Sequence, residues 1–173
     1  MQDFVSPEAL MAAYRWVDAV RTNDFFKMWI HTDANLRLCE AQLWVHANQA
    51  FPDVAAEDRD QLAADMARLS SSHPLRQEFE RLRVAANAES IPSGDLGAAT
   101  ARRQVADDLE VVILILEGTV PQIIEDETLL DPEQSCLLLM RLTPEGWLVA
   151  GRDYNPPVPG WPPESGTPRD IIP

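Results

Sequence analysis

The chain has few cysteines, one lysine and no long hydrophobic run, and each shortage excludes a class of protein. Two cysteines in 173 residues, Cys39 and Cys136, exclude a disulfide-rich secreted scaffold. They could pair only if the fold brought their Cα atoms within about 7 Å, so two free, buried thiols are expected. The longest aliphatic run, residues 111–116, is far shorter than a membrane span. Without a signal peptide at the start of the sequence, a cytoplasmic location is expected.

Acidic residues outnumber basic ones twofold. The 28 acidic and 14 basic residues give a net charge of −14, and Lys27 is the single lysine. A field of this sign repels phosphate backbones and anionic lipids, so neither nucleic acid nor a membrane is an expected partner. The negative charge also suggests one hypothesis about function, that an acidic surface masks a basic protein partner.

The strong motifs of cofactor and metal chemistry are missing. The sequence contains no GxxxxGK[ST], GxGxxG, HExxH, GxSxG or paired CxxC. The three histidines, His31, His46 and His73, are too far apart to form a local metal site. The acidic segment 125–133 lacks the alternating ligands and central glycine of a calcium loop. No cofactor and no metal are therefore expected.

Helical periodicity runs through the N-terminal half. Ser6 and Pro7 are a typical helix start, and apolar residues then recur at helical spacing to about Thr22. Asp24 and Asp33 can each cap a following helix. Helices are thus predicted over residues 6–22, 25–30, 33–48, 55–70 and 75–88, with a loop over 91–97 and a further helical turn within 98–104.

From residue 107 the pattern becomes that of β-strands. Residues 109–116 and 136–142 are almost wholly aliphatic, so both faces of each strand are apolar. Thr143 to Gly146 form a turn into a strand over 147–154, and a short strand is expected at 122–124. The sequence predicts one α+β domain over residues 1–155, with a curled antiparallel sheet that is buried on both faces. The Pro-rich residues 156–173 are predicted to be an extended tail, ordered to about Trp161.

Three segments resemble the NTF2-like, or SnoaL-like, superfamily. They are RTNDFFKMW (21–29), DANLRLCEAQLWV (33–45) and MRLTPEGWLVAGRDYNPPVPGWPP (140–163), the last being similar to actinobacterial members. The resemblance implies a cone in which N-terminal helices pack on a curved antiparallel sheet, with residues 55–88 as a helical insertion. The superfamily includes ketosteroid isomerases, cyclases and many non-enzymes, so the fold alone implies no function.

The resemblance places a site at the mouth of the cone. A polar group that aromatic rings desolvate there would have a displaced pKa and could act on a small apolar molecule. Arg152 could approach this mouth from the last strand. The ligand-binding candidates are Trp29, Arg37, Glu40 and Trp44, and the catalytic candidates are His31, Asp33, Arg37 and Tyr154.

Structural roles compete with these functional ones. Arg37 and Glu40 have the spacing of an ordinary helical ion pair, and His31 can bind the last carbonyls of the short helix before it. Arg141 is expected to pair with Glu117, Asp107 or Asp153. Trp147 and Trp161 are expected to be packing anchors.

Apolar strands and missing motifs favour a non-catalytic module that binds a small molecule or a protein. The alternative is a SnoaL-type isomerase, hydrolase or cyclase that acts on a small apolar substrate. A sheet with two apolar faces needs two covers, and the first three helices supply one. The second is either the helices at 55–88 or another subunit, and a homodimer through the sheet face is expected.

Overall fold

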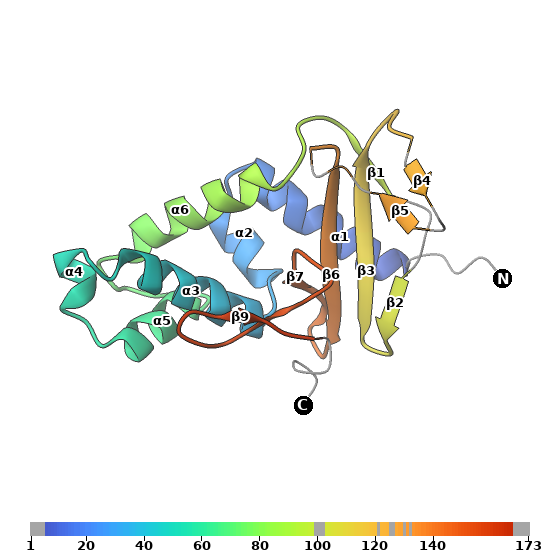
Figure 1. The fold of residues 1–173 in the computed structure, drawn as a ribbon. Coiled ribbons are helices and arrows are strands. Elements are labelled where there is room, and N and C mark those ends of the chain that lie inside the picture. The colour runs from blue at the N-terminus through green and yellow to red at the C-terminus, as the bar shows by residue number, and fades with distance from the viewer. Residues whose placement is uncertain are drawn as a thin grey trace.

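The computed structural model describes residues 6–98, 103–120, 122–124, 127–129, 131 and 133–167. Helices precede an antiparallel sheet, as predicted for an α+β domain, and most of them extend away from it (Figure 1). The helices are α1 (Pro7–Arg21), α2 (Phe25–Ile30), α3 (Ala34–Asn48), α4 (Pro52–Ala55), α5 (Arg59–Ala67) and α6 (Arg76–Glu89). The strands are β1 (Leu96–Ala98), β2 (Arg103–Ala106), β3 (Leu109–Leu116), β4 (Gln122–Ile124), β5 (Glu127–Leu129), β6 (Ser135–Thr143), β7 (Gly146–Gly151), β8 (Pro157–Val158) and β9 (Glu164–Ser165).

Short polar side chains start the helices. The first turn of a helix has backbone N–H groups without an intrahelical acceptor, and a preceding Ser or Asp accepts from one of them. Ser6 accepts from the backbone N–H of Ala9, Asp24 from that of Lys27 and Asp33 from that of Asn35. The predicted starts of the first three helices are thus confirmed.

Three predictions between the third helix and the main strands are wrong in part. The helix expected over residues 55–70 is shorter, because α4 ends at Ala55 and Asp58 caps α5, which covers only Arg59–Ala67. The helical turn expected within 98–104 is contradicted at its C-terminal end, where β2 pairs with β3. The predicted loop at 91–97 ends in β1, which also pairs with β3. Pairing with the long edge of β3 overrides the weak local preference of these residues.

The main sheet has the strand order β1-β3-β6-β7, and β2 pairs with β3 beside β1. Aligned pairs such as Val112 with Leu138 and Leu114 with Cys136 face the helices. The opposite face carries Leu109, Val111, Ile113, Leu139 and Ala150, each at most 6% exposed within a single chain. Burial of both faces is therefore confirmed.

The helices at 55–88 do not cover the outer face of the sheet. The main contacts of α5 are with α3, and those of α6 are with α1 and α2. Their buried side chains belong to the core on the inner face of the sheet. They lengthen the helical layer instead of adding a second one.

The junction between α2 and α3 is hydrogen-bonded to β7. The backbone N–H of Val149 donates to the carbonyl of His31 (2.9 Å), and the N–H of Asp33 donates to the carbonyl of Val149 (2.8 Å). Between them Thr32 is 2% exposed, and its hydroxyl accepts from the indole N–H of Trp16 on α1 (3.0 Å). These contacts fix the start of α3 against the end of the sheet.

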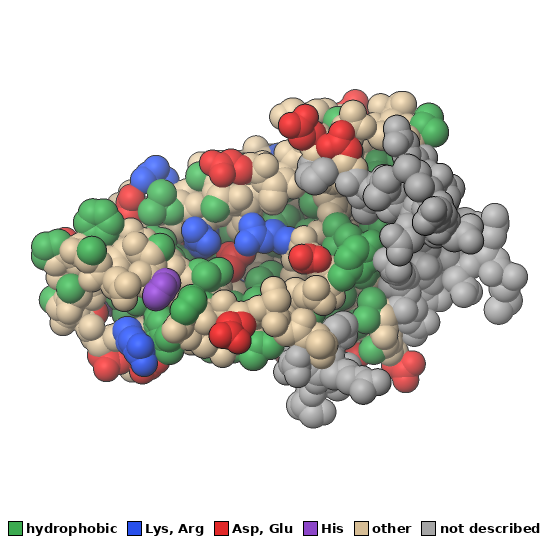
Figure 2. Space-filling view, viewed as in Figure 1, with side chains coloured by type: hydrophobic (Ala, Val, Ile, Leu, Met, Phe, Trp, Pro, Cys, Tyr) green, Lys and Arg blue, Asp and Glu red, His purple; other side chains and the backbone are tan. Residues whose placement is uncertain are grey.

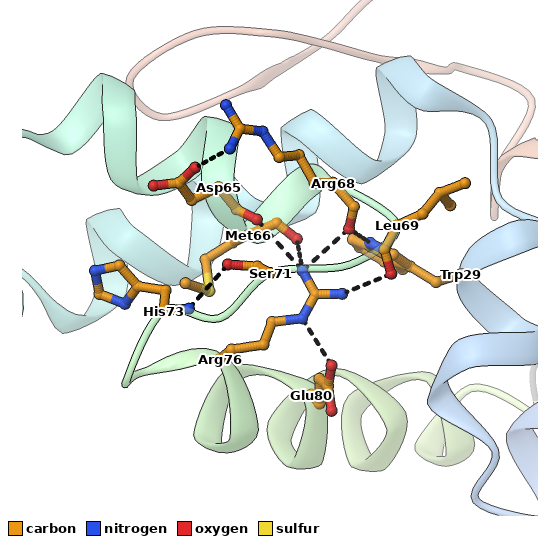
Figure 3. A network of polar contacts seen from close by, with 9 residues as sticks. All are labelled: Trp29, Asp65, Met66, Arg68, Leu69, Ser71, His73, Arg76 and Glu80. Atoms are coloured by element: carbon orange, nitrogen blue, oxygen red, sulfur yellow. Dashed lines mark hydrogen bonds and ion pairs between the residues drawn. The ribbon is translucent and has the colours of Figure 1, made fainter.

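Arg76 closes the C-terminal end of α5 (Figure 3). The last carbonyls of a helix have no intrahelical donor, and a guanidinium offers five N–H groups. Its Nη1 donates to the carbonyls of Met66 (2.7 Å) and Arg68 (3.1 Å), and its Nε donates to Glu80 (2.7 Å). Arg76 is 5% exposed, with its guanidinium over the ring of Phe25. This buried cation is well paired and structural.

The C-terminal tail is fastened to the helical layer. Asn35 donates to the carbonyl of Pro157 (2.8 Å), and the backbone N–H of Gly160 donates to the side chain of Gln42 (3.0 Å). The indole of Trp161 donates to Asp60 (2.8 Å) and lies under the guanidinium of Arg59. Trp161 is thus an anchor as predicted, and the described part of the tail runs beyond it to residue 167.

The described residues contain neither a membrane-spanning helix nor a disulfide bond. No helix there is both long and apolar enough to cross a bilayer. Cys39 and Cys136 are free and buried, as expected. Trp147 is half-buried and packs against the inner core, in line with its predicted anchoring role.

Candidate functional site

Polar side chains face one another between α3 and α6. Glu40 and Trp44 lie one turn apart on α3, and Arg83 and Asn87 lie one turn apart on α6. Residues four apart share a helix face, so each helix presents a pair on one side. Arg152, which follows β7, makes an ion pair with Glu40 (Nη2 to Oε1, 3.3 Å). These five residues are called the α3–α6 polar cluster below.

Three of the five cluster residues are buried, and the cluster is incompletely hydrogen-bonded. Glu40 is 2% exposed, Asn87 1% and Trp44 4%. Four of its atoms, Glu40 Oε2, Trp44 Nε1, Arg83 Nε and Asn87 Oδ1, have no hydrogen-bond partner within the described part of the chain. Most buried polar atoms in proteins are paired, because leaving one unpaired costs about 1–3 kcal/mol. Two donors and two acceptors therefore lack a partner among the described residues.

Two cations share one carboxylate in this cluster. Burial lowers the pKa of the Arg83 guanidinium, the carboxylate of Glu40 opposes that change, and the nearby Arg152 adds to it. Figure 2 shows basic and acidic side chains side by side between α6 and the segments below it. The cluster thus carries a surplus positive charge inside a chain whose net charge is −14.

A cavity of about 390 Å³ adjoins the cluster at Arg152. Its wall joins the end of α6, the start of β6 and the segment that follows β7. Burial raises the pKa of the Cys136 thiol in this wall to about 11, although Arg152 opposes the change. The thiol therefore stays protonated at neutral pH and is a poor nucleophile. The lining residues are Glu89, Ser90, Ser135, Cys136, Leu137, Arg152, Asp153 and Tyr154.

Asp33 and Arg37 lie at the junction of α2 and α3 and hold it together. Asp33 caps α3, and Arg37 donates from Nη1 to the carbonyls of Trp29 (3.2 Å) and Thr32 (3.1 Å). The predicted ion pair between Arg37 and Glu40 is wrong, because Glu40 pairs with Arg152. Burial lowers the pKa of the Arg37 guanidinium, and Asp33 opposes that change.

The partners predicted for Arg141 are also wrong. Its guanidinium lies 3.8 Å from Asp33 and 3.8 Å from Asp108. The sheet register places Arg141 opposite Leu109 on β3, next to Asp108 in the turn. Spacing along the sequence could not reveal that the start of α3 meets this end of β6.

Two further candidates lie apart from the cluster. Trp29 is fully buried, and its indole donates to the carbonyl of Arg68 (3.0 Å). His31 ends α2 as its C-cap and borders a separate cavity of about 730 Å³ between α1 and the β6–β7 hairpin. Burial lowers the pKa of His31, and the cation of Arg15 lowers it further.

The structure thus brings together four of the residues proposed from the sequence and separates the others. Glu40 and Trp44 share the cluster with Arg152, and Tyr154 lines the cavity that Arg152 also lines. Trp29, His31, Asp33 and Arg37 occupy the α2–α3 region.

Sequence reasoning missed Arg83, Asn87 and Glu110. Arg83 and Asn87 continue the inward stripe of α6 that starts at Phe79, whose ring packs 5.6 Å from that of Trp44. A polar residue every four positions behind a buried Phe was the available signal. Glu110 is a buried acid within an aliphatic strand and accepts from the backbone N–H of Ser6 (3.0 Å).

Comparison of the chain with family models, with curated proteins and with solved structures gives no match. Within the ranges that the structure describes, no group of three or more His, Cys, Asp or Glu side chains could hold a metal ion. The α3–α6 polar cluster and its cavity are therefore the candidate functional site.

Proposed function

We propose that this chain is a small-molecule-binding domain whose ligand contacts the α3–α6 polar cluster and extends into the adjoining cavity. The observation that carries the proposal is the buried Oε2 atom of Glu40, for which no described residue provides a donor. A carboxylate oxygen in a dry site needs hydrogen bonds to offset its desolvation. Trp44 Nε1, Arg83 Nε and Asn87 Oδ1 are three more unpaired atoms on the same two helices.

A buried polar group of the same chain is well paired, and four of the five buried side-chain atoms without a described partner belong to the cluster, the fifth being Arg37 Nε. Arg76, on the same helix as Arg83, donates to several carbonyls and to Glu80. Burial in this protein is thus compatible with complete pairing. A ligand that supplies the missing partners accounts for the difference.

An NTF2-like fold is part of the proposal. The segment 33–45 contacts the other two segments that carry the resemblance: Asp33 and Asn35 donate to the carbonyls of Val149 and Pro157, and Arg37 donates to the carbonyl of Trp29. α1 and α3 contact the inner face of the sheet, as the resemblance implies for the first helices, whereas the polar cluster lies between α3 and α6, a helix of the predicted insertion.

A binding role without catalysis is favoured by the inner face of the sheet. Its central residues are Val112, Leu114, Leu138 and Met140, none of which can transfer a proton, and the buried acid on this face, Glu110, accepts from the backbone N–H of Ser6 at the start of α1. Asp33 and Arg37 are engaged in holding the α2–α3 junction. A SnoaL-type isomerase, hydrolase or cyclase is the second candidate, because the unpaired oxygen of Glu40 is also what a general base requires.

A titration followed by NMR tests the binding role. The indole N–H of Trp44 is an unpaired donor in the cluster, and its signal can be assigned by comparison with Trp44→Phe. Fragments from a library of small soluble compounds are expected to shift this signal, and Glu40→Gln is expected to weaken their binding at least tenfold. Glu145→Gln, an exposed acid on the β6–β7 turn, is the matched control and should bind normally.

Two results would contradict the proposal. Either no fragment shifts the Trp44 signal, or the fragments that shift it bind equally well to Glu40→Gln. Prolonged incubation separates the two candidate functions, since a binding domain leaves the fragment unchanged and an enzyme converts it.

The homodimer and the cytoplasmic location stay predictions. The outer sheet face was expected to need a second subunit, yet Leu109, Val111 and Leu139 are fully buried within one chain. Burial of this face therefore gives no reason for a dimer. Light scattering on the purified protein tests the expectation, with 19.3 kDa for a monomer and twice that for a dimer.

A further inference from the structure

The charges of the α3–α6 polar cluster constrain the chemistry of its ligand. Arg83 and Arg152 are two guanidiniums near a single carboxylate, that of Glu40. Arg152, whose side chain is 31% exposed, already pairs with Glu40, and the half-buried Arg83 has an Nε atom without a described partner, so an incoming anion would balance the second guanidinium. A carboxylate suits a guanidinium well, because its two oxygens match the planar N–H groups.

The carboxylate of Glu40 favours a positively charged group on the same ligand. Glu40 is 2% exposed; its Oε1 pairs with Arg152, and its Oε2 has no donor among the described residues. Asn87 Oδ1 is a second unpaired acceptor nearby on α6. An ammonium group has three N–H donors and would pair with acceptors of this kind.

The surroundings favour a ligand that is neutral overall. Glu89 and Asp153 are exposed acids on the cavity wall, and the whole chain carries −14, so a simple anion is repelled on approach. A zwitterion has no net charge and escapes this repulsion. Leu137, Cys136 and the ring of Tyr154 provide apolar wall for a side chain, and about 390 Å³ is enough for a molecule of amino-acid size.

We infer that the ligand is an α-amino acid with an apolar side chain, an inference that rests on the proposed binding function. Its carboxylate binds Arg83 and Arg152, its ammonium binds Glu40 Oε2, and its side chain occupies the cavity beside β6. The two helices recognise the charged groups, and the sheet selects the apolar part.

The experiment compares each amino acid with two molecules that lack one of its charged groups. L-phenylalanine is titrated alongside 3-phenylpropionate and 2-phenylethylamine, and L-leucine alongside 4-methylpentanoate and 3-methylbutylamine. Binding is followed by calorimetry and by the Trp44 indole signal. At least one of the two amino acids is expected to bind ten times more tightly than the corresponding acid and the corresponding amine.

Variants separate the two ends of the ligand. Glu40→Gln is expected to weaken binding of the amino acid at least tenfold and to leave 3-phenylpropionate unchanged or tighter, because an anion no longer meets Glu40. Arg83→Gln is expected to weaken the amino acid and the acid but not the amine. Glu145→Gln is the control for a lost carboxylate at a distant, exposed position.

The outcomes distinguish this inference from the function on which it rests. Equal binding of an amino acid and its acid, or of an amino acid and its amine, overturns the inference. The same holds if no amino acid binds while library fragments still shift the Trp44 signal, and the binding function then survives. If neither amino acids nor fragments shift that signal, both fail. The comparison of ligands on the unaltered protein decides the matter even if a variant folds poorly.

Discussion

Replacing Arg76 by methionine should lower the free energy of unfolding by about 3 kcal/mol. The strongest losses are the hydrogen bond to the carbonyl of Met66 (2.7 Å) and the bond to Glu80 (2.7 Å). A buried hydrogen bond from a charged group contributes about 1.5–3 kcal/mol, and the half-exposed pair with Glu80 contributes about 0.5–1 kcal/mol. Arg68 keeps a donor in Trp29, so its carbonyl adds little. Methionine keeps a flexible apolar stem in the space of the arginine, while the guanidinium over the ring of Phe25 is lost with the hydrogen bonds.

Urea unfolding followed by tryptophan fluorescence measures this loss. The matched control is Arg81→Met, which makes the same substitution on α6 but removes only an exposed ion pair with Glu78. The control should leave the unfolding midpoint unchanged. A loss below about 1 kcal/mol for Arg76→Met would show that water replaces the guanidinium at the carbonyls, and the reasoning about the end of α5 would be wrong.

Two further predictions concern the core. Thr32→Val should lower the free energy of unfolding by about 1–3 kcal/mol, because it leaves the buried indole N–H of Trp16 without its acceptor. The control is Thr22→Val at an exposed position, and equal urea midpoints for the two variants would contradict the prediction. Burial raises the pKa of Cys39 to about 12 and that of Cys136 to about 11, from an ordinary 9.0. The unfolded chain therefore ionises its thiols first, so their contribution to stability is complete below pH 9 and is lost as the pH rises through the folded pKa values, about 11 for Cys136 and about 12 for Cys39. A double Cys→Ala variant should lose less stability across this range, and an equal loss in both proteins would count against it.

Local signals predicted the helices that begin with a capping side chain. Ser6, Asp24 and Asp33 each precede an apolar repeat, and a cap acts through neighbouring backbone groups alone. The long strands β3 and β6 were equally visible, because apolar residues on both faces leave few other structures. The short strand β2 was not, because it exists only through its pairing with β3.

The candidate site was predictable only where its residues lie close together in the sequence. Glu40 and Trp44 were proposed from one helix, where spacing reveals which side chains share a face. Arg83 and Asn87 join them from a helix some 40 positions later, and no local pattern tells which stripe of α6 meets α3. The wrong pairing of Arg37 with Glu40 has this cause: the true partner, Arg152, arrives with the last strand of the sheet.

The hydrogen bonds between β7 and the α2–α3 junction also bear on how this protein meets other chains. Strands at the border of a sheet offer free backbone groups to which a foreign strand can add, and this is a common route to aggregation. At the middle of β7 those groups are already used by His31 and Asp33. The α2–α3 junction thus blocks this part of the edge strand. A second chain cannot extend the sheet there without first displacing the start of α3.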